Sequence, residues 1–387
     1  METKKLYYDD SHRKTFTSKV VSCTQAEGGY QVILEATAFY PEGGGQPSDT
    51  GVLGESRVLS VRETEGQIVH LCDTPLDVGM EVTGTIDWER RFDFMQQHSG
   101  EHIVSGIIYE MYGYHNVGFH MGSDVVTFDF DGPIPAEDLQ TIEDRANAVV
   151  WENLPVRCYY PSEAELPTIA YRRKRDLPWP VRLVEFPGVD LCACCGTQVQ
   201  YTGEIGMIKL LSCVKFHDGV RMEMACGKRA QKILATIFDQ NRQVSQAFSA
   251  KIWETGAAAN RMNETLAAEK FRSASLEKQL FSYIAKEYAG TSLALHFSES
   301  LTPAANRELC NAIAQQADVA VTLTGTDDTG YGICIISRSQ NAKTLGAAAV
   351  AALGGRGGGK PEAFQGTVTA NRSKITAYFQ QEKNNLT

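Results

Sequence analysis

Two histidines four residues apart are the residues whose spacing most directly suggests chemistry in this sequence. His98 and His102 lie in a segment with good helix potential, which continues through an apolar run to about Gly113. In an α-helix, residues four apart share a face, so both imidazoles can reach one ion. Neutral imidazole is the commonest metal ligand. The pair alone also fits one exposed histidine and one histidine satisfied in the core.

A second cluster of candidate ligands lies far downstream. Residues 190–198 read DLCACCGTQ and hold three of the ten cysteines. Two histidines and a thiolate form a recognised zinc set, with a further position left for water or another ligand. The two clusters together therefore predict a zinc site. Most other cysteines are scattered singly, and we interpret them as small buried apolar residues rather than as disulfide partners.

Composition and charge limit the class of protein. A chain of 387 residues with 43% apolar and 22% charged residues is typical of two or three globular domains. The start lacks an apolar signal-peptide core, and residues 345–353, the most membrane-like run, are too short to span a bilayer. These features predict a cytoplasmic protein. A formal net charge of −10 does not favour non-specific nucleic-acid binding, but local basic patches govern phosphate contacts. Residues 172–175 (RRKR) are such a patch or a solvated face.

The pattern of elements predicts an α+β protein with four parts. Residues 1–90 contain short strands with glycine-bearing turns, which favour a small β-barrel-like domain. Residues 91–227 mix helices and strands and contain both ligand clusters. Residues 228–289 have helical periodicity, with a predicted break at Gly256, and form an arm that is a candidate dimer seam. Residues 290–387 alternate between strands and helices, as in a separate α/β domain.

Two glycine-rich stretches are further candidates for ligand contact. Residues 37–51 contain three successive glycines, which allow a ligand to approach the backbone closely, although a surface turn has the same composition. Residues 354–361 (GGRGGGKP) satisfy the G-x-x-x-x-G-K part of a P-loop. Pro361, however, stands where Ser or Thr should bind magnesium, so we reject nucleotide binding. A glycine nest that contacts phosphates and a plain tight turn both stay open.

Several motifs in order carry a resemblance to a known family. They are residues 39–46 (FYPEGGGQ), 98–102 (HSGEH), 194–197 (CCGT), 202–206 (TGEIG) and 219–223 (GVRME). Taken together they resemble the editing domain of alanyl-tRNA synthetase, and residues 354–366 are similar to the DHH-associated C-terminal domain of that enzyme. Over nearly the whole chain, the arrangement resembles the long form of the free-standing AlaX-type trans-editing proteins.

The resemblance implies an ATP-independent aminoacyl-tRNA deacylase that serves translation fidelity. Its partner would be tRNA(Ala) mischarged with serine or glycine, and a homodimer could form through the arm or the C-terminal domain. The zinc ligands of the family fall on His98, His102 and Cys194. The family's fourth ligand is a histidine, and here that position is Gln198.

The departure at Gln198 leaves three arrangements of the zinc site open. In the first, the amide oxygen of Gln198 binds zinc, but weakly, because zinc favours N and S donors. In the second, water occupies the fourth position. In the third, Cys195 or Cys192 is the fourth ligand. We favour three protein ligands with water, because Cys195 would point away from Cys194 in an extended segment.

The resemblance also implies further site residues. Glu101 is a candidate general base, although its position about 100° round the helix from His102 favours a solvent-facing carboxylate. Gln46 is a candidate hydrogen-bond donor to the substrate. The substrate-binding candidates are Thr37, Gly44, Gly45, Asn116, His120 and Thr197. A side chain that hydrogen-bonds the substrate hydroxyl would select serine over alanine, and Asn116 and His120 are the candidates for it, unless they are structural polar residues.

Two other functions compete with the editing hydrolase. Residues 98–102 also fit H-x-x-E-H, the signature of a class of zinc metalloproteases, with Glu101 as the base. That hypothesis leaves the cysteine cluster and the C-terminal glycine stretch without a role. The non-enzymatic alternative is a tRNA-binding protein that lost catalysis through the change at Gln198. The editing hydrolase is our preferred hypothesis.

Overall fold

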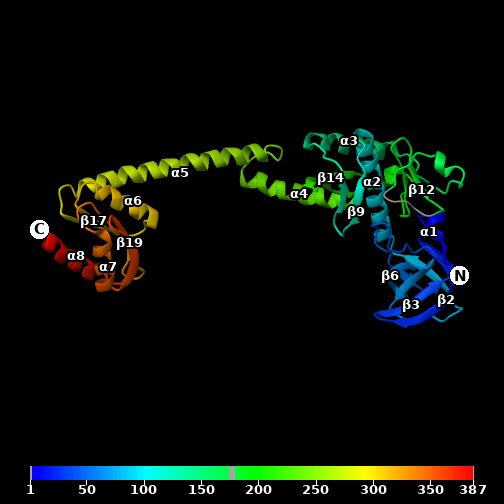
Figure 1. Cartoon of the computed structure of the whole chain (residues 1–387), viewed down its shortest axis with the longest axis horizontal. Coiled ribbons are helices and arrows are strands. Elements are labelled where there is room, and N and C mark those ends of the chain that lie inside the picture. Colours follow the sequence, from blue (N-terminus) through cyan, green and yellow to red (C-terminus); the bar gives the residue numbers. More distant parts are fainter. Residues whose placement is uncertain (1, 174–178, 387) are drawn as a thin grey trace. The chain divides into compact units, whose positions relative to one another are not determined.

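The computed structural model describes residues 2–173 and 179–386 (Figure 1). The chain forms two compact units, residues 1–243 and residues 244–387. Helices and strands are mixed in both units, which confirms the predicted α+β class. The finer predicted borders at residues 90, 227 and 289 stay predictions. Among the described residues, no helix is long and apolar enough to cross a membrane.

The first unit begins with a small sheet that closes on itself. Its six strands pair in the closed order β2, β3, β7, β6, β5, β8. Their bounds are β2 Thr15–Ala26, β3 Gly29–Leu34, β5 Gly51–Leu53, β6 Ser56–Thr64, β7 Gln67–Cys72 and β8 Glu81–Ile86. Exposed and buried side chains alternate at the start of β2, because successive side chains of a strand point to opposite faces. Apolar side chains such as Val32, Leu53 and Ile68 fill the interior. Outside this order, β1 (Lys4–Lys5) pairs with β4 (Ala36–Thr37), and the short helix α1 is Leu6–Asp9.

The helix α2 (Trp88–Tyr112) is the central element of the first unit. Asp87 caps its N-terminus by accepting a hydrogen bond from the Arg90 amide at 3.3 Å. Gly113 follows its last residue in the left-handed conformation at φ 75°, which confirms the predicted end of the helix near this residue. All of residues 94–108 are buried. A helix that is buried on every side must be covered by other elements all round.

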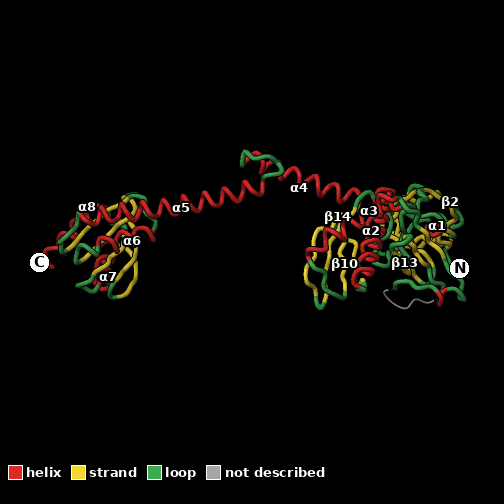
Figure 2. Tube along the Cα trace, turned by 90° about the horizontal axis from the view of Figure 1, so that it is seen from above, coloured by secondary structure: helices red, strands yellow, loops and turns green. Residues whose placement is uncertain are grey.

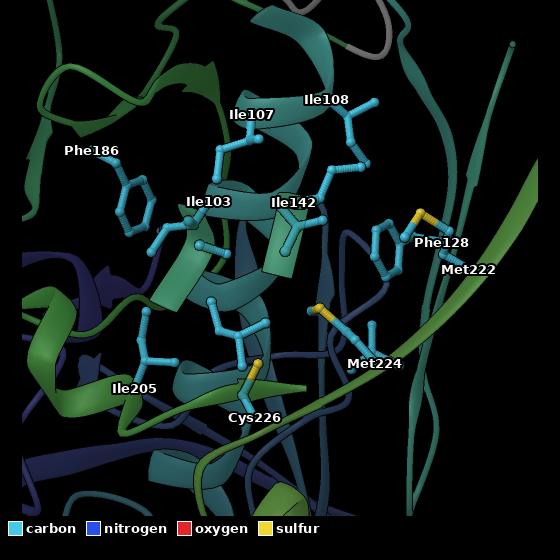
Figure 3. Packing of buried hydrophobic residues seen from close by; sticks show 14 of the residues in the cluster. Ile103, Ile107, Ile108, Phe128, Ile142, Phe186, Ile205, Met222, Met224 and Cys226 are labelled. Atoms are coloured by element: carbon cyan, nitrogen blue, oxygen red, sulfur yellow. The ribbon is translucent and has the colours of Figure 1, made fainter. Parts of the chain in front are cut away.

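Two antiparallel sheets and a second helix cover α2. The first sheet has the order β14-β15-β10-β9, and the second has the order β11-β12-β13. The bounds are β9 Asn116–Met121, β10 Val126–Phe130, β11 Arg157–Tyr159, β12 Leu183–Phe186, β13 Asp190–Ala193, β14 Ile208–Phe216 and β15 Gly219–Cys226, with α3 Leu139–Glu152 and the 3-10 turns Ala136–Asp138, Leu166–Thr168 and Thr202–Ile205. In Figure 3, Phe128 of the first sheet and Phe186 of the second lie on opposite sides of the isoleucines of α2, and Ile142 of α3 joins the same cluster.

The predicted helical arm is two helices, α4 (Gly227–Ala247) and α5 (Thr255–Lys286). The predicted interruption of the arm exists, but it covers residues 248–254, so its predicted position at Gly256 is wrong. Gly256 lies in the first turn of α5, which continues without a break to Lys286 (Figure 2). A glycine in the first turn of a long helix lowers its stability only slightly and need not end it.

The second unit contains a five-stranded sheet in the order β16-β17-β18-β20-β19, with β16 parallel to β17 and the other pairs antiparallel. The bounds are β16 Leu293–Ser298, β17 Val319–Thr326, β18 Gly330–Ser337, β19 Gly355–Lys360, β20 Ala363–Val368, α6 Pro303–Ile313, α7 Ala342–Leu353 and α8 Arg372–Leu386. Its core includes Leu323, Ile335 and Phe364.

The glycine-rich residues 354–361 form neither the nest nor the tight turn that the sequence predicted. Most of them belong to β19, an edge strand that pairs with β20 and is exposed along its whole length. A Cβ atom on Gly355 would lie 1.9 Å from the backbone oxygen of Thr367, and one on Gly359 would lie 2.1 Å from that of Ala363. Glycine is therefore required here for the close approach of two strands.

Candidate metal centre

Three side chains from distant parts of the first unit converge on one point. His98 and His102 are adjacent on one face of α2, with ring centroids 5.3 Å apart. Cys194 follows β13, and its Sγ lies 3.4 Å from His98 Nε2. One ligand atom from each of the three residues lies within 4.8 Å of the others. The structure therefore brings together the two predicted clusters in an arrangement that could hold a metal ion.

Each histidine is fixed by a hydrogen bond at its Nδ1 atom. His98 Nδ1 lies 3.0 Å from Gln46 Oε1, and His102 Nδ1 lies 2.9 Å from Asp190 Oδ2. Both partners are acceptors, so each ring donates a hydrogen bond from Nδ1 and leaves Nε2 as the atom that can bind a metal ion. His102 Nε2 is buried and has no hydrogen-bond partner in the described part of the chain. A buried nitrogen of this kind fits a metal ligand.

Aromatic rings and a buried ion pair hold these groups in place. Phe119 stacks on His98 at 5.2 Å between centroids, and Phe186 stacks on His102 at 5.5 Å. Asp190 also receives two hydrogen bonds from Arg172, at 2.6 and 2.8 Å. The acceptor of His102 is thus itself fixed, as is usual for partners of metal ligands.

The charges of the three converging groups are mutually dependent. Burial alone would raise the pKa of Cys194, but the adjacent His98 and His102 outweigh it and hold that pKa well below its ordinary value. Burial opposes the charged form of His102, but the Cys194 thiolate and Asp190 raise the pKa of His102 to about 10. A metal ion that binds such a thiolate and protonated imidazole displaces the proton of the imidazole nitrogen that becomes its ligand.

The loop after Cys194 is held tightly against His98. The amide of Gly196 donates to Cys194 Sγ at 3.3 Å. Arg182 Nη1 donates to the backbone oxygens of Cys194 and Gly196 at 2.9 and 3.0 Å. A Cβ atom on Gly196 would lie 2.1 Å from His98 Cε1. Only glycine fits at this position.

Gln46 and Thr197 are fully buried and bonded to each other. Gln46 Nε2 donates to Thr197 Oγ1 at 2.8 Å, and the Thr197 amide donates to Gln46 Oε1 at 3.2 Å. The amide of Gln46 is therefore occupied by Thr197 and His98. The structure brings both residues to the histidines, and their predicted contact with substrate stays a prediction.

Glu101 is buried, so the expectation of a solvent-facing carboxylate is wrong. The reason is that α2 has no solvent-facing side over this stretch. Glu101 Oε1 accepts hydrogen bonds from Ser105 Oγ at 2.7 Å and from Asn116 Nδ2. Asn116 Oδ1 is also buried and, among the described residues, has no hydrogen-bond partner. Asn116 thus lies against α2 beside Glu101, the residue that precedes His102.

Three other predicted substrate-binding residues differ in their positions. Gly45, at φ 85°, approaches Phe119 so closely that a Cβ atom would lie 2.5 Å from its ring, whereas Gly44 faces open space. The hydrogen bonds of Thr37 in the described part of the chain are to residues other than the candidate metal ligands. Its Oγ1 lies 2.8 Å from His70 Nε2 and accepts from the Phe39 amide at 3.1 Å.

His120 is exposed on β9. It lies on the face opposite to Phe119, because neighbouring side chains of a strand point to opposite faces. The structure therefore does not bring it to the two histidines. Within the predicted basic run, Lys174 and Arg175 lie outside the described residues, and Arg172 is bonded to Asp190.

Gln198, the predicted fourth position, lies beside the thiolate. Its side chain is buried, and Nε2 lies 3.6 Å from Cys194 Sγ. Of the other candidate cysteines, Cys195 is exposed, and Cys192 is buried in a second group with His102 and Asp190.

Three stretches of the chain match known families. Residues 2–90 match the family described as tRNA synthetases class II (A). Residues 181–223 match the threonyl and alanyl tRNA synthetase second additional domain, and residues 288–384 match the DHHA1 domain. The alanyl-tRNA editing protein Aarsd1 of Rattus norvegicus is 29% identical, over 96% of this chain and 96% of that protein. The resemblance to the alanyl-tRNA editing proteins is confirmed.

Other relatives agree with this resemblance. The same editing protein of Danio rerio is 27% identical over 96% of both chains. The alanine–tRNA ligase of Ignicoccus hospitalis is 35% identical over 64% of this chain and 28% of that enzyme. Among solved structures, the C-Ala domain of Aquifex aeolicus alanyl-tRNA synthetase matches 25% of this chain and 93% of its own at 23% identity. Its TM-score of 0.23 is too low to support an argument.

Sequence reasoning missed the residues that fix the ligands. Asp190 could have been found, because Asp190, Cys192 and Cys194 alternate along an extended segment and therefore share a face. The roles of Arg182 and Phe119 depend on contacts between segments that are distant in sequence, for which the local pattern has no signal.

Proposed function

We propose that this chain is a hydrolase that removes mischarged amino acids from tRNA(Ala) at a zinc-containing site. The observation that carries the proposal is the convergence of His98, His102 and Cys194, each with one ligand atom within 4.8 Å of the others. It occurs in a chain that matches alanyl-tRNA editing proteins along nearly its whole length. The substrates would be seryl- and glycyl-tRNA(Ala).

The donor set fits zinc better than other common ions. Two imidazole nitrogens and one thiolate are the N and S donors that zinc prefers, and three protein ligands are typical of catalytic zinc. When bound, the ion supplies a Lewis acid that polarises an ester carbonyl or acidifies a water molecule. Gln46 and Asp190 act through the histidines, because each accepts a hydrogen bond from Nδ1 and so fixes the orientation of the ring that would bind zinc through Nε2.

Glu101 and Asn116 would supply the selection of serine. The Glu101 carboxylate accepts a hydrogen bond from Asn116 Nδ2. This bond fixes the amide, and Oδ1 has no partner among the residues that the structure describes. Oδ1 would accept a hydrogen bond from the seryl hydroxyl, and alanine would leave it unsatisfied. A buried group left unpaired discriminates far more strongly than a hydrophobic pocket that senses a methylene. In this proposal Glu101 orients Asn116 rather than acting as the general base.

The second unit is proposed to contact tRNA(Ala), because its residues 288–384 match the DHHA1 domain and the alanyl-tRNA editing protein Aarsd1 aligns with 96% of this chain. Large apolar side chains are exposed on α5, among them Met262, Leu266 and Leu280. The predicted homodimer contact through this arm or through the C-terminal domain stays a prediction.

The test combines metal analysis with deacylation of seryl-, glycyl- and alanyl-tRNA(Ala) by the purified protein. We expect bound zinc in a one-to-one ratio with the chain, rapid hydrolysis of the seryl ester and little hydrolysis of the alanyl ester. Cys194→Ser should lose both zinc and activity. Its matched control is Cys195→Ser, which changes an exposed neighbouring cysteine and should keep both.

The same experiment separates the competing functions. Tight binding of tRNA(Ala) without turnover would identify an inactive binding protein. Cleavage of peptides without deacylation would identify a metalloprotease, a function that the engagement of Glu101 by Ser105 and Asn116 already disfavours.

A further inference from the structure

The amide of Gln198 is held by two different partners. Ser99 Oγ donates to Gln198 Oε1 at 2.7 Å, and Gln198 Nε2 donates to Cys194 Sγ at 3.6 Å. Ser99 lies on α2 next to His98, and its side chain is fully buried. The Val199 amide donates to the same Ser99 oxygen at 3.1 Å. These contacts fix both ends of a side chain at the position of the family's fourth ligand.

The chemistry of the neighbours favours this orientation over the flipped amide. Ser99 already accepts a hydrogen bond from Val199, so its hydroxyl hydrogen is free to be donated to an oxygen. A flipped amide would place Oε1, a partial negative charge, against the Cys194 thiolate. Sulfur would then lose one of its two N–H donors, of which the other is the Gly196 amide.

We infer that Gln198 is a hydrogen-bond donor to the Cys194 thiolate and not a ligand of the metal. The inference rests on the proposed zinc site and deepens it. With the oxygen of Gln198 held by Ser99, the protein would supply three ligands to a bound zinc ion, and a fourth position would be available to water or substrate. Gln198 and Gly196 each donate an N–H to the sulfur, and these two hydrogen bonds stabilise the negative charge of the thiolate. Gln198 is thus a positioning residue.

Ser99→Ala distinguishes the two roles of Gln198 by the sign of its effect on zinc affinity. If Gln198 donates to sulfur, loss of Ser99 releases the amide, and zinc affinity falls by about 10- to 100-fold, as for other partners of metal ligands. If Gln198 binds zinc through its oxygen, Ser99 competes for that oxygen, and the variant binds zinc more tightly. Affinity is measured by competition with a chelator in the absence of tRNA, and Ser99→Thr, which keeps the hydroxyl, is the control.

A second measurement uses the wild-type protein and does not depend on how Ser99→Ala folds. The infrared band of the Gln198 carbonyl is isolated as the difference between glutamine-labelled wild type and Gln198→Met. The inference expects this band to stay in place when zinc is added, because the carbonyl stays bonded to Ser99. A zinc-dependent shift, or an unchanged or higher zinc affinity of Ser99→Ala, would overturn it. Both readouts are independent of deacylation, so zinc binding without hydrolysis would refute the proposed function alone.

Discussion

Replacing Gly196 by alanine tests whether the loop after Cys194 sets the position of His98. The added Cβ would lie 2.1 Å from His98 Cε1 and 2.3 Å from Nδ1, whereas an ordinary contact begins at 3.4 Å. The loop cannot retreat easily, because Arg182 holds the backbone oxygens on both sides of Cys195. The imidazole must therefore move by more than 1 Å, the difference between 2.1 and 3.4 Å.

Metal ligands tolerate displacements of only about 0.2 Å. Changes to residues that hold metal ligands in place lower metal affinity by roughly 10- to 100-fold. We therefore expect Gly196→Ala to lower zinc affinity by a factor of about 100. Deacylation of seryl-tRNA(Ala) should fall with it at limiting zinc. The matched control is Gly43→Ala in the glycine turn, where the nearest atom, Tyr40 Oη, lies at 3.7 Å. A folded Gly196→Ala protein that binds zinc with wild-type affinity would refute the reasoning.

Three further predictions concern stability and the second unit. Arg91→Met leaves the fully buried carboxylate of Asp49 without its ion-pair partner and should lower the free energy of unfolding by about 3–5 kcal/mol, measured by thermal unfolding. The control Arg57→Met removes an exposed ion pair and should lower it by less than about 1 kcal/mol. Equal losses in the two variants would contradict this prediction. Burial lowers the pKa of His70 to about 4, so the neutral ring contributes about 3 kcal/mol to the free energy of unfolding above pH ~6.5, and this contribution is lost as the pH falls to ~4. His70→Gln should therefore flatten the dependence of stability on pH in this range. An unchanged dependence would count against the prediction. A protein of residues 1–243 alone should still bind zinc and hydrolyse the ester. Its kcat/KM for seryl-tRNA(Ala) should be lower than that of the full chain, because contacts far from the reacting group help to position it. Unchanged kinetics would argue against a role of the second unit.

The sequence predicted local features of the site well. Residues four apart share a face of any α-helix, so the pairing of His98 and His102 could be predicted from their spacing. The predicted end of the helix near Gly113 is confirmed. The convergence of these histidines with Cys194 depends on a long-range contact, and the particular cysteine was indicated only by the resemblance to the editing family.

The failures have physical causes. Glu101 was expected to face solvent because it lies about 100° round the helix from His102. However, α2 is enclosed by two sheets and α3, so that side of the helix is buried as well. The glycines of residues 354–361 suggested a turn by composition. Their lack of side chains instead allows β19 to approach β20 closely, which only the pairing of strands can reveal.

The most direct test of the central claim is a zinc titration of the metal-free protein, with single-turnover hydrolysis of seryl-tRNA(Ala) as the readout. The proposed site has one set of ligands, His98, His102 and Cys194. Activity should therefore rise in proportion to added zinc, reach its plateau at one equivalent per chain and stay absent in Cys194→Ser at the same zinc concentrations. Full activity of the metal-free protein, or a Cys194→Ser variant with the wild-type response, would contradict a zinc-dependent editing site at these residues.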